Sequence, residues 1–183
     1  MEIKEYIING GKKNFKISKL KANYVSDKTY SSARDILVRT CHDIFLKVKI
    51  EDDQDGILLV KRKQNPAKGL LWCIGGGKKR GVPLEKSIKD IVKQECNLEI
   101  DGEIHLIDLG EFYFRTNPFG TKKGVDDFAL VFYAVGRGKI KLNALHTDPI
   151  IITKENYRKI RRILHPYLSK NIDKIFSEYW QKS

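Results

Sequence analysis

The chain has 183 residues, of which 41% are hydrophobic and 32% are charged, a balance that predicts one compact domain with short terminal additions. This composition excludes a collagen, a disordered tail and a disulfide-stabilised scaffold. No stretch reaches the roughly 18 to 20 apolar residues of a membrane-spanning helix, and the N-terminus lacks the apolar core of a signal peptide, so we expect a cytoplasmic protein with no membrane span.

The net charge of the chain is high and positive. Lys and Arg number 35 against 23 Asp and Glu, which gives a formal charge of +12 at pH 7. Residues 1–30 carry a net charge of +4 and residues 154–183 one of +5, so most of the excess lies near the termini. This favours an anionic partner such as a nucleotide, a nucleic acid or an acidic membrane surface, and charge alone does not choose among them.

The three cysteines, Cys41, Cys73 and Cys96, are an odd number and lie far apart in the sequence. Their spacing indicates neither a disulfide framework nor a zinc knuckle. We expect them to be small buried side chains in a reducing compartment.

Hydrophobic periodicity predicts the order of the elements. Alternating apolar positions predict strands, and apolar residues from Leu84 to Val92 have the spacing of an amphipathic helix with Pro83 at its first turn. Helical spacing returns after residue 154, interrupted by Pro166, and predicts two C-terminal helices. In chain order we expect a hairpin or irregular arm (1–30), strands (35–50, 57–62, 70–74), a helix (83–96), strands (104–109, 111–115, 127–135), a short apolar segment (150–152) and two helices (154–181).

This order predicts the fold class and the domain organisation. Strands that flank one internal helix, with helices at the end, give an α/β or α+β layered domain. The sequence has no internal repeat, low-complexity tract or linker. We therefore divide the chain into an N-terminal arm (1–35), a central domain (36–153) and basic C-terminal helices packed on that domain (154–183).

Three consecutive glycines, Gly75, Gly76 and Gly77, lie between a predicted strand and the predicted helix. Backbone without side-chain bulk can turn its N–H groups toward an anion or its carbonyl groups toward a metal ion. A plain glycine turn explains the tripeptide equally well, so the flanking residues must decide between the two interpretations.

The segment from Gly56 to Leu98 resembles the signature region of the Nudix hydrolases. The predicted strand that ends at Arg62 is similar to the family's strand ending in Arg, and Gly69 to Gly77 is similar to its Gly-x-Trp-x-x-Pro-Gly-Gly segment. With the flanking strands, the resemblance covers residues 36–153. It implies a Nudix-type α/β/α sandwich with a mixed sheet, here with an N-terminal arm and a C-terminal helical extension.

The signature box that follows these glycines is degenerate. In the family, glutamates at helix positions i, i+3 and i+4 form one edge that binds Mg²⁺ bridging a substrate diphosphate, and one carboxylate cannot build that cluster. Counting from Gly77 is a competing alignment, with Trp72 as the family tryptophan and Gly75 at the proline position. Counted from Gly76, the residues that match are Gly76, Val92, Glu95 and Leu98, whereas Val82, Ile91 and Gln94 replace three signature glutamates and Asp90 replaces the arginine.

One branch of the family, GDP-mannose mannosyl hydrolase, manages with fewer glutamates and is similar to this chain in two further places. Residues 62–69 resemble its Lys-Arg-x-x-x-Pro-Ala-x-Gly loop, and residues 117–120 resemble its Asn-Phe-x-Gly turn. In that branch a glycine carbonyl, the last signature glutamate and a late side chain hold one metal ion, and a late histidine acts as base. The corresponding residues here are Gly75 or Gly76, Glu95, Leu145 and His146, of which Leu145 is not a ligand type.

The resemblance thus implies a set of site residues. The guanidinium of Arg62 could grip a diphosphate through two hydrogen bonds, and His146 could act as a base. The alternatives are a solvated helix residue for Glu95, one of several exposed basic groups for Arg62 and an ordinary loop histidine for His146. The expected catalytic residues are Glu95, His146 and Arg62, the substrate-binding residues are Arg62, Gly75, Gly76, Gly77 and Lys78, and the metal ligands are Glu95 and the backbone of Gly76.

Two functions from different classes follow. The first is a Nudix-type hydrolase that acts on a nucleoside diphosphate linked to another moiety, such as a nucleotide sugar, with Mg²⁺ or Mn²⁺ that binds weakly without substrate. The second is a catalytically reduced Nudix domain that binds a nucleotide or RNA, or serves as an interaction module. The carboxylate count favours the second function, and the loop at 62–69 favours the first, which we take as the leading hypothesis.

The basic C-terminal helices also have two interpretations. Their charged face is either a solvated surface over a packed apolar face or a surface that holds single-stranded nucleic acid by charge and stacking. No recognisable nucleic-acid module is present in the sequence. The sequence leaves open whether the chain forms a homodimer.

Overall fold

The structure is a computed structural model and describes Ile17, Leu20, Phe119 and residues 25–49, 54–116 and 123–181. Most of the expected N-terminal hairpin (1–30) and of the turn at 117–120 lies outside the described residues. Within these ranges, no helix combines the length and the apolar character needed to cross a membrane.

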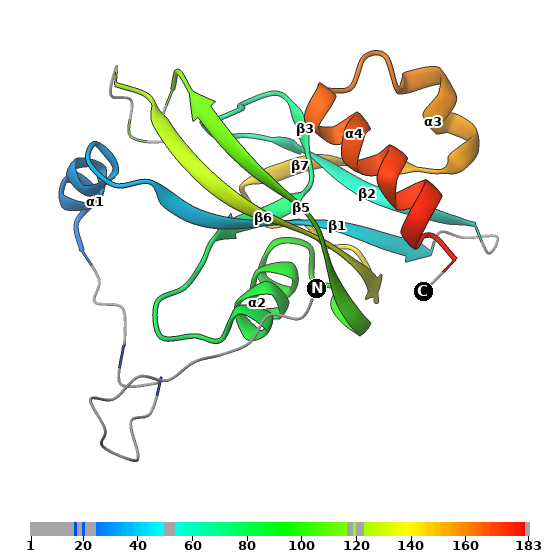
Figure 1. Ribbon diagram of the computed structural model, residues 1–183, viewed down its shortest axis with the longest axis horizontal. Helices are drawn as coiled ribbons and strands as arrows, with labels where there is room; N and C mark the ends of the chain where they lie inside the picture. Colours follow the sequence, from blue (N-terminus) through cyan, green and yellow to red (C-terminus); the bar gives the residue numbers. More distant parts are fainter. Residues whose placement is uncertain are drawn as a thin grey trace.

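A mixed sheet of seven strands forms the centre of the molecule (Figure 1). Its main path runs β3-β2-β1-β6-β5, with β4 added beside β1 and β7 beside β2. The strands are β1 (Arg39–Lys49), β2 (Asp55–Arg62), β3 (Leu71–Trp72), β4 (Ile74–Gly77), β5 (Glu99–Phe114), β6 (Val125–Arg137) and β7 (His146–Ile152).

Strand β1 is the central strand and has neighbours on both sides along its length. It pairs in parallel with β6 from Arg39 to Val48. On its other side, it pairs with the glycines of β4 near its start and with β2 near its end, both antiparallel. Because the partner changes midway along β1, the sheet brings β4, the loop after β2 and the beginning of β1 together at one end.

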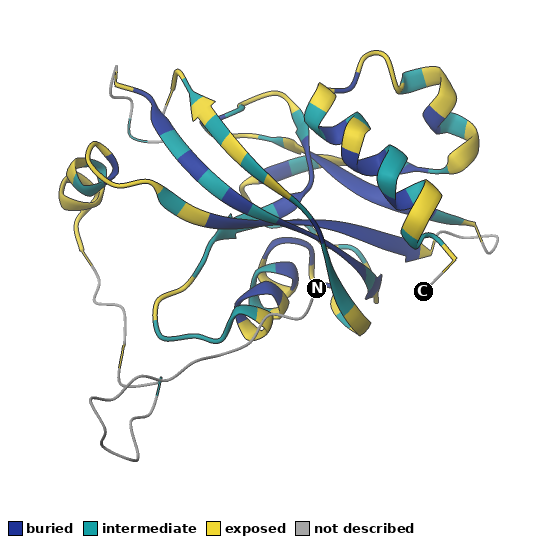
Figure 2. Cartoon of the chain, viewed as in Figure 1, coloured by how far each residue is buried: buried dark blue, intermediate teal, exposed yellow. Residues whose placement is uncertain are grey.

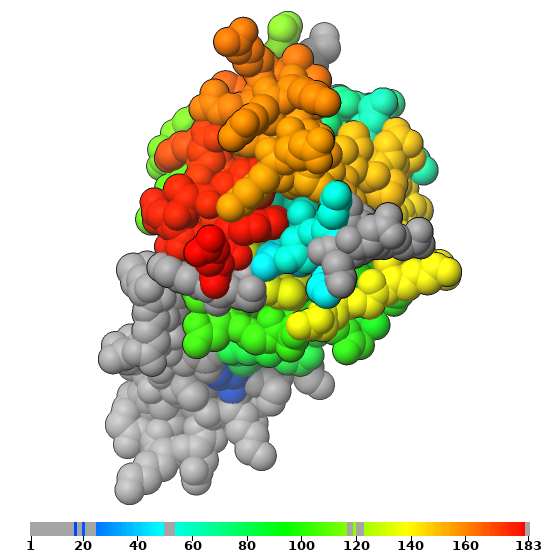
Figure 3. Space-filling model, turned by 90° about the vertical axis from the view of Figure 1, so that its right-hand side faces the viewer, coloured from blue at the N-terminus to red at the C-terminus, as the bar shows by residue number. Residues whose placement is uncertain are grey.

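Helices cover both faces of the sheet, as expected for a layered α/β domain. Even-numbered residues of β1, such as Ile44 and Leu46, pack in one buried cluster with α2 (Leu84–Cys96). Odd-numbered Phe45 packs in a second cluster with α3 (Lys154–Ile160), α4 (Pro166–Lys174) and the π-helical turn η3 (Ile175–Tyr179). Figure 2 shows the resulting buried strands at the centre, and Figure 3 shows the C-terminal helices, in orange and red, beside the ends of β1 and β2 in cyan.

The expected helix over 83–96 and the two C-terminal helices are confirmed, and several strand limits differ. The expected strand over 35–50 begins only at Arg39, because Asp27–Arg34 forms a helix, α1, capped by the Ser26 side chain. The strands expected at 104–109 and 111–115 are one strand, β5, since the register shifts between Leu106 and Asp108 let it continue. Gly75 to Gly77 lie in β4 rather than in a turn.

Candidate functional site

A cavity of about 210 Å³ opens where the start of β1 meets β4. Residues from six strands, two loops and α2 line it, and they include the signature glutamate, the arginine at the end of β2 and two glycines of β4. The lining residues are Arg39, Cys41, Asp43, Arg62, Gln64, Asn65, Pro66, Trp72, Gly75, Gly76, Glu95, Phe112, Phe114, Asp127, Ala129 and Leu145. The structure therefore brings together Arg62, Gly75, Gly76 and Glu95, which the sequence placed in one site.

Glu95 lies near the end of α2 and reaches the cavity from a buried position. The residue is 5% exposed, and its carboxylate accepts a hydrogen bond of 3.2 Å from the backbone N–H of Gly75. Burial raises the pKa of Glu95 to about 7, partly offset by the Gly75 hydrogen bond and the positive charge of Arg62. Glu95 is thus a buried carboxyl group and not a solvated helix residue.

Asp43 is a second buried carboxyl group in the cavity, and it comes from the middle of β1. One of its oxygens accepts hydrogen bonds from the indole N–H of Trp72 (3.2 Å) and from the hydroxyl of Tyr167 on α4 (2.8 Å). Burial raises the pKa of Asp43, and these two donors and Arg62 lower it in part. Through Tyr167, helix α4 holds a side chain that lines the cavity without lining the cavity itself.

Gly75 has to be a glycine because its backbone lies against Asp43. A Cβ atom at this position would stand 2.6 Å from the carboxylate oxygen of Asp43 and 2.6 Å from the carbonyl oxygen of His42. Because of this close approach, the Gly75 N–H reaches Glu95. The carboxyl groups of Asp43 and Glu95 therefore both lie beside Gly75 of β4.

His146 lies behind Glu95 and is not among the residues that line the cavity. Its Nε2 atom is 3.9 Å from the Glu95 carboxylate. Burial and the charge of Arg62 lower the pKa of His146 to about 4, so the ring is neutral near pH 7 and the two side chains form no ion pair. The Asn143 Oδ1 atom accepts from the Leu145 N–H and lies 3.1 Å from Nδ1 of His146. We therefore assign the proton to Nδ1, which leaves a lone pair on Nε2 facing Glu95.

Arg39 adds a second guanidinium to the cavity, held by Asp127 of β6. Its Nη2 and Nε atoms donate to the two Asp127 oxygens at 2.9 and 3.3 Å. Asp127 also accepts a bond of 2.6 Å from Arg34 of α1, whose Nη1 atom is buried without a hydrogen-bond partner among the described residues. One carboxylate between two guanidinium groups leaves this group of three with a net positive charge beside the cavity.

Aromatic rings form the remaining wall. Phe112 and Phe114 of β5 stack with an interplanar angle of 8°, and Trp72 packs against Phe112 in a T-shaped arrangement. A cavity with two guanidinium groups, three buried carboxyl groups and an aromatic wall can hold an anionic group beside a flat apolar one.

The donor set for a divalent cation is small. Among the residues that the structure describes, no three His, Cys, Asp or Glu side chains lie close enough together to hold a metal ion. The Ile91 side chain, at a signature glutamate position, contacts Gly76, since a Cβ there would be 3.2 Å from Ile91 Cδ1. The side chains in the described ranges therefore make no preformed site for Mg²⁺ or Mn²⁺, which prefer several oxygen ligands.

The local geometry favours the alignment counted from Gly76. Val92 and Leu98, at the aliphatic positions, are buried, and Glu95 reaches the cavity. Asn97, at the family's glycine position, ends α2 in the left-handed conformation with φ of 61°, which glycine and asparagine adopt most easily. The count from Gly77 would put the exposed Lys93 at an aliphatic position.

The structure separates some of the expected residues and adds others. Gly77 and Lys78 line a neighbouring groove and not the cavity. Sequence reasoning missed Asp43, Arg39 and Asp127. A signal existed for Asp43, because an acid in the middle of an alternating apolar strand is unusual at a buried position.

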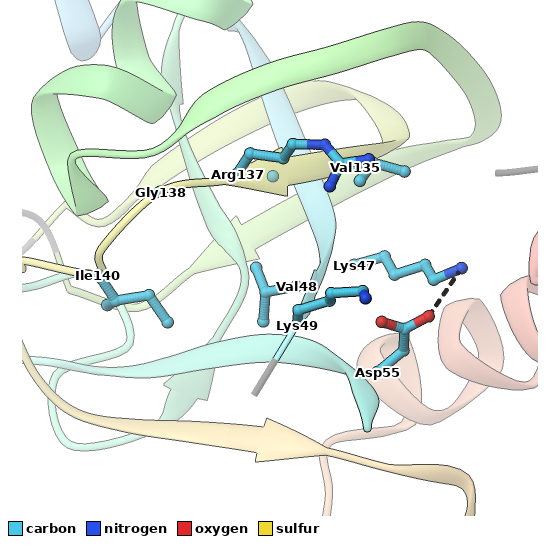
Figure 4. Close-up of a pocket in the computed structure, with 9 residues that line it drawn as sticks. Lys47, Val48, Lys49, Asp55, Val135, Arg137, Gly138 and Ile140 are labelled. Atoms are coloured by element: carbon cyan, nitrogen blue, oxygen red, sulfur yellow. Dashed lines mark ion pairs between the residues drawn. The ribbon is translucent and has the colours of Figure 1, made fainter. Parts of the chain in front are cut away.

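A further cavity of about 330 Å³ lies at the opposite end of β1, where β1 and β6 end (Figure 4). Lys47, Lys49 and Arg137 line it together with Asp55, whose carboxylate is 3.1 Å from Nζ of Lys47. None of the expected site residues takes part in it.

Comparison with solved structures identifies the fold. The Nudix domain of Shewanella oneidensis NrtR, complexed with ADP-ribose, matches with a TM-score of 0.51 at 16% identity over 74% of this chain and 88% of its own. A Caenorhabditis elegans Ap4A hydrolase matches with a TM-score of 0.53 at 14% identity over 80% and 100%. A bifunctional NMN adenylyltransferase/ADP-ribose pyrophosphatase from Francisella tularensis, complexed with AMP and a manganese ion, matches at 0.54 and 17% identity over 82% of this chain and 44% of its own.

These likenesses show that the chain has the Nudix fold, a mixed α/β architecture, as the sequence predicted. No protein-family model and no curated protein matches the chain. At these identities the similarity extends to the fold alone.

Proposed function

We propose that the chain binds and hydrolyses a nucleoside diphosphate joined to a second moiety. The observation that carries the proposal is the meeting of Arg62 and Glu95 in one cavity over the glycines of β4. A guanidinium group and a buried carboxyl group supply the two things that the reaction needs, an anion-binding group and a proton-transfer group. The loop at 62–69 suggests a nucleotide sugar as the substrate.

Each residue has one assigned role in this proposal. Arg62 binds the diphosphate. The backbone of Gly75 and Gly76 lies against this diphosphate. Glu95 exchanges a proton with the reacting group. The Nε2 lone pair of His146, 3.9 Å from Glu95, is placed to support that exchange from behind.

The structural neighbours agree with this ligand class without identifying the substrate. One neighbour is complexed with ADP-ribose and another with AMP and a manganese ion, and a third is named as an Ap4A hydrolase. We infer that this chain also takes a nucleotide derivative. We expect Mg²⁺ or Mn²⁺ to bind only when the diphosphate supplies oxygen ligands that the protein lacks.

A binding domain without hydrolysis is the second candidate. Ile91 fills the place of a signature carboxylate against Gly76, and no group of three metal-ligating side chains forms in the described part of the chain. This candidate predicts that the chain binds nucleotide derivatives and releases no product.

A substrate panel tests both candidates. Nucleoside diphosphate sugars, dinucleoside polyphosphates and capped RNA are incubated with the protein, with and without Mg²⁺ or Mn²⁺, and products are measured by chromatography. We expect turnover of at least one diphosphate compound and a loss of about 10²-fold or more in Glu95→Gln and Arg62→Ala. The exposed Glu99→Gln and Arg158→Ala variants are matched controls. Binding without product in the whole panel would establish the second candidate, and neither binding nor product would refute both.

A further inference from the structure

A basic surface surrounds the turn that joins α3 to α4. This turn forms an outer end of the molecule, in orange at the top of Figures 1 and 3, and none of its residues lines the cavity. Glu155, in the first turn of α3, is the only acid of that helix. The segment 158–163, called the basic turn below, contains no acid, and its exposed basic residues are Arg158, Lys159, Arg161 and Arg162.

Three of these four charges are available to a partner. Arg161 is paired with Asp173 of α4 at 2.6 Å. In contrast, no carboxylate in the described ranges forms an ion pair with Arg158, Lys159 or Arg162. The basic turn therefore presents uncompensated positive charge to solvent and favours an anionic partner.

Ile163 places an apolar side chain in the middle of this charge. It is 80% exposed, whereas the next residue, Leu164, is 7% exposed and packs in the core cluster with the C-terminal helices. The backbone N–H of Ile163 donates to the carbonyl oxygen of Ile160 at 2.9 Å, and the pairing of Arg161 with Asp173 ties the turn to α4. The fold thus holds Ile163 outward on a fixed turn.

The aromatic rings of the C-terminal helices are packed against other groups, which disfavours single-stranded nucleic acid as the partner. Binding of that kind needs exposed rings on which bases stack. None of the aromatic side chains from 154 to 181 is exposed. Tyr157 is buried, Tyr167 stacks on Trp72, and Trp180 packs against Phe176 with ring centroids 4.8 Å apart.

We propose that the basic turn binds the surface of a membrane that contains anionic phospholipids. Arg158, Lys159 and Arg162 contact the headgroup phosphates, and Ile163 inserts into the boundary between headgroups and acyl chains. An acidic lipid surface attracts nearby basic side chains, and burial of one aliphatic side chain adds to that attraction. Because the charges are few and the inserted side chain is small, the attachment is peripheral and reversible. It does not depend on the reaction proposed for the cavity.

The test measures cosedimentation of the full chain with two kinds of vesicle. One is phosphatidylcholine alone, and the other is phosphatidylcholine and phosphatidylserine in equal parts. The Arg158→Gln/Arg162→Gln variant removes two of the available charges, and Ile163→Ser removes the apolar side chain and keeps the charges. Circular dichroism and urea titration establish that each variant is folded.

Each variant has a matched control elsewhere on the molecule. Lys89→Gln/Lys93→Gln lowers the net charge by the same amount on the exposed side of α2, which covers the other face of the sheet. Ile36→Ser removes an isoleucine that is also 80% exposed. The controls separate the basic turn from net charge and from general surface hydrophobicity.

We expect the wild type to bind the vesicles that contain phosphatidylserine, less tightly as salt rises, and not to bind phosphatidylcholine alone. Arg158→Gln/Arg162→Gln should weaken this binding at least about tenfold, and Ile163→Ser about fivefold or more. Both controls should stay within about threefold of the wild type.

Three results would overturn the proposal. The first is a wild type that does not bind the acidic vesicles or binds both kinds equally, and the second is an equal loss in a variant and its control. The third is tight binding of a single-stranded RNA oligomer that displaces the vesicles and is weakened by Arg158→Gln/Arg162→Gln but not by Ile163→Ser. That third result would identify nucleic acid as the partner of the basic turn.

Discussion

Burial gives the carboxyl group of Glu95 a pKa of about 7 where an exposed glutamate has 4.5. Below pH 4.5 the group is protonated in the folded and the unfolded chain. As pH rises, the unfolded chain loses this proton first, so the contribution of Glu95 to stability falls until pH passes about 7. Between pH 4.5 and about 7, the contribution of Glu95 to the free energy of unfolding changes by a total on the order of 3 kcal/mol.

The Glu95→Gln variant should remove this pH dependence, because glutamine resembles the protonated carboxyl group. We expect the free energy of unfolding of the wild type to fall relative to that of the variant between pH 4.5 and 7. Urea titrations of both proteins across this range measure the difference. The low pKa of His146 makes the free energy of unfolding rise with pH in both proteins. This contribution largely cancels in the difference between wild type and variant. A constant difference would show that Glu95 is ionised in the fold at pH 5.

Sequence reasoning brought together the candidate residues that belong to a local motif, and they line one cavity. Glu95 and Arg62 follow from the spacing of the box and the strand before it. Asp43, Arg39 and Asp127 could not be placed, because they join the cavity only when β1 pairs with β6, and 88 positions separate Arg39 from Asp127. The position of His146 in a strand was missed for the same reason, since β7 forms only against β2.

At the scale of elements, the helix of the box was the most predictable part and α1 the least. The apolar spacing of α2, its proline and its asparagine end are all local signals. In contrast, α1 has few apolar residues and is tied to the sheet by the buried contact of Arg34 with Asp127, which periodicity does not reveal.

Helix α2 can be used to test the alignment. We expect wild-type affinity for Mg²⁺ or Mn²⁺ without nucleotide to be weaker than micromolar. The combined variant Val82→Glu, Asp90→Arg, Ile91→Glu and Gln94→Glu should bind these ions more tightly, because it restores carboxylates beside Glu95. Calorimetry measures both affinities, and circular dichroism checks the fold. A folded variant without any gain would refute the alignment from Gly76.

Helix α4 holds the cavity residue Asp43 through one hydroxyl group, that of Tyr167. The Tyr167→Phe variant removes the 2.8 Å hydrogen bond to Asp43 and leaves the ring contacts with Trp72 and Phe112 in place. We expect a loss of about 1 to 3 kcal/mol in stability and a higher pKa of Asp43, because the ionised carboxylate loses a donor. Denaturant titration measures the loss of stability. A Tyr167→Phe variant as stable as the wild type would contradict the role assigned to this bond.

At the scale of the whole molecule, the positive charge of the C-terminal helices lies away from the cavity lining. Neutralising Lys159, Arg161 and Arg162 should change the salt dependence of ligand association or nucleic-acid affinity and leave turnover nearly constant, because distant exposed charges are screened. Because Arg161 also forms an ion pair with Asp173, the free energy of unfolding of this variant is measured as well. Loss of function in this variant, with Glu95→Ala still active, would favour the binding-domain candidate.

The parallel pairing of β1 with β6 also governs how the chain reaches its fold. The two strands at the centre of the sheet come from distant parts of the sequence, so the largest entropy of loop closure is overcome before the core can form. During synthesis, β1, β2 and α2 leave the ribosome well before β6. Until β6 emerges, the edge of β1 that pairs with β6 has no partner strand. Folding is therefore slow compared with a helical bundle of this length, and the emerging chain is most prone to aggregation in the interval before residue 137 appears.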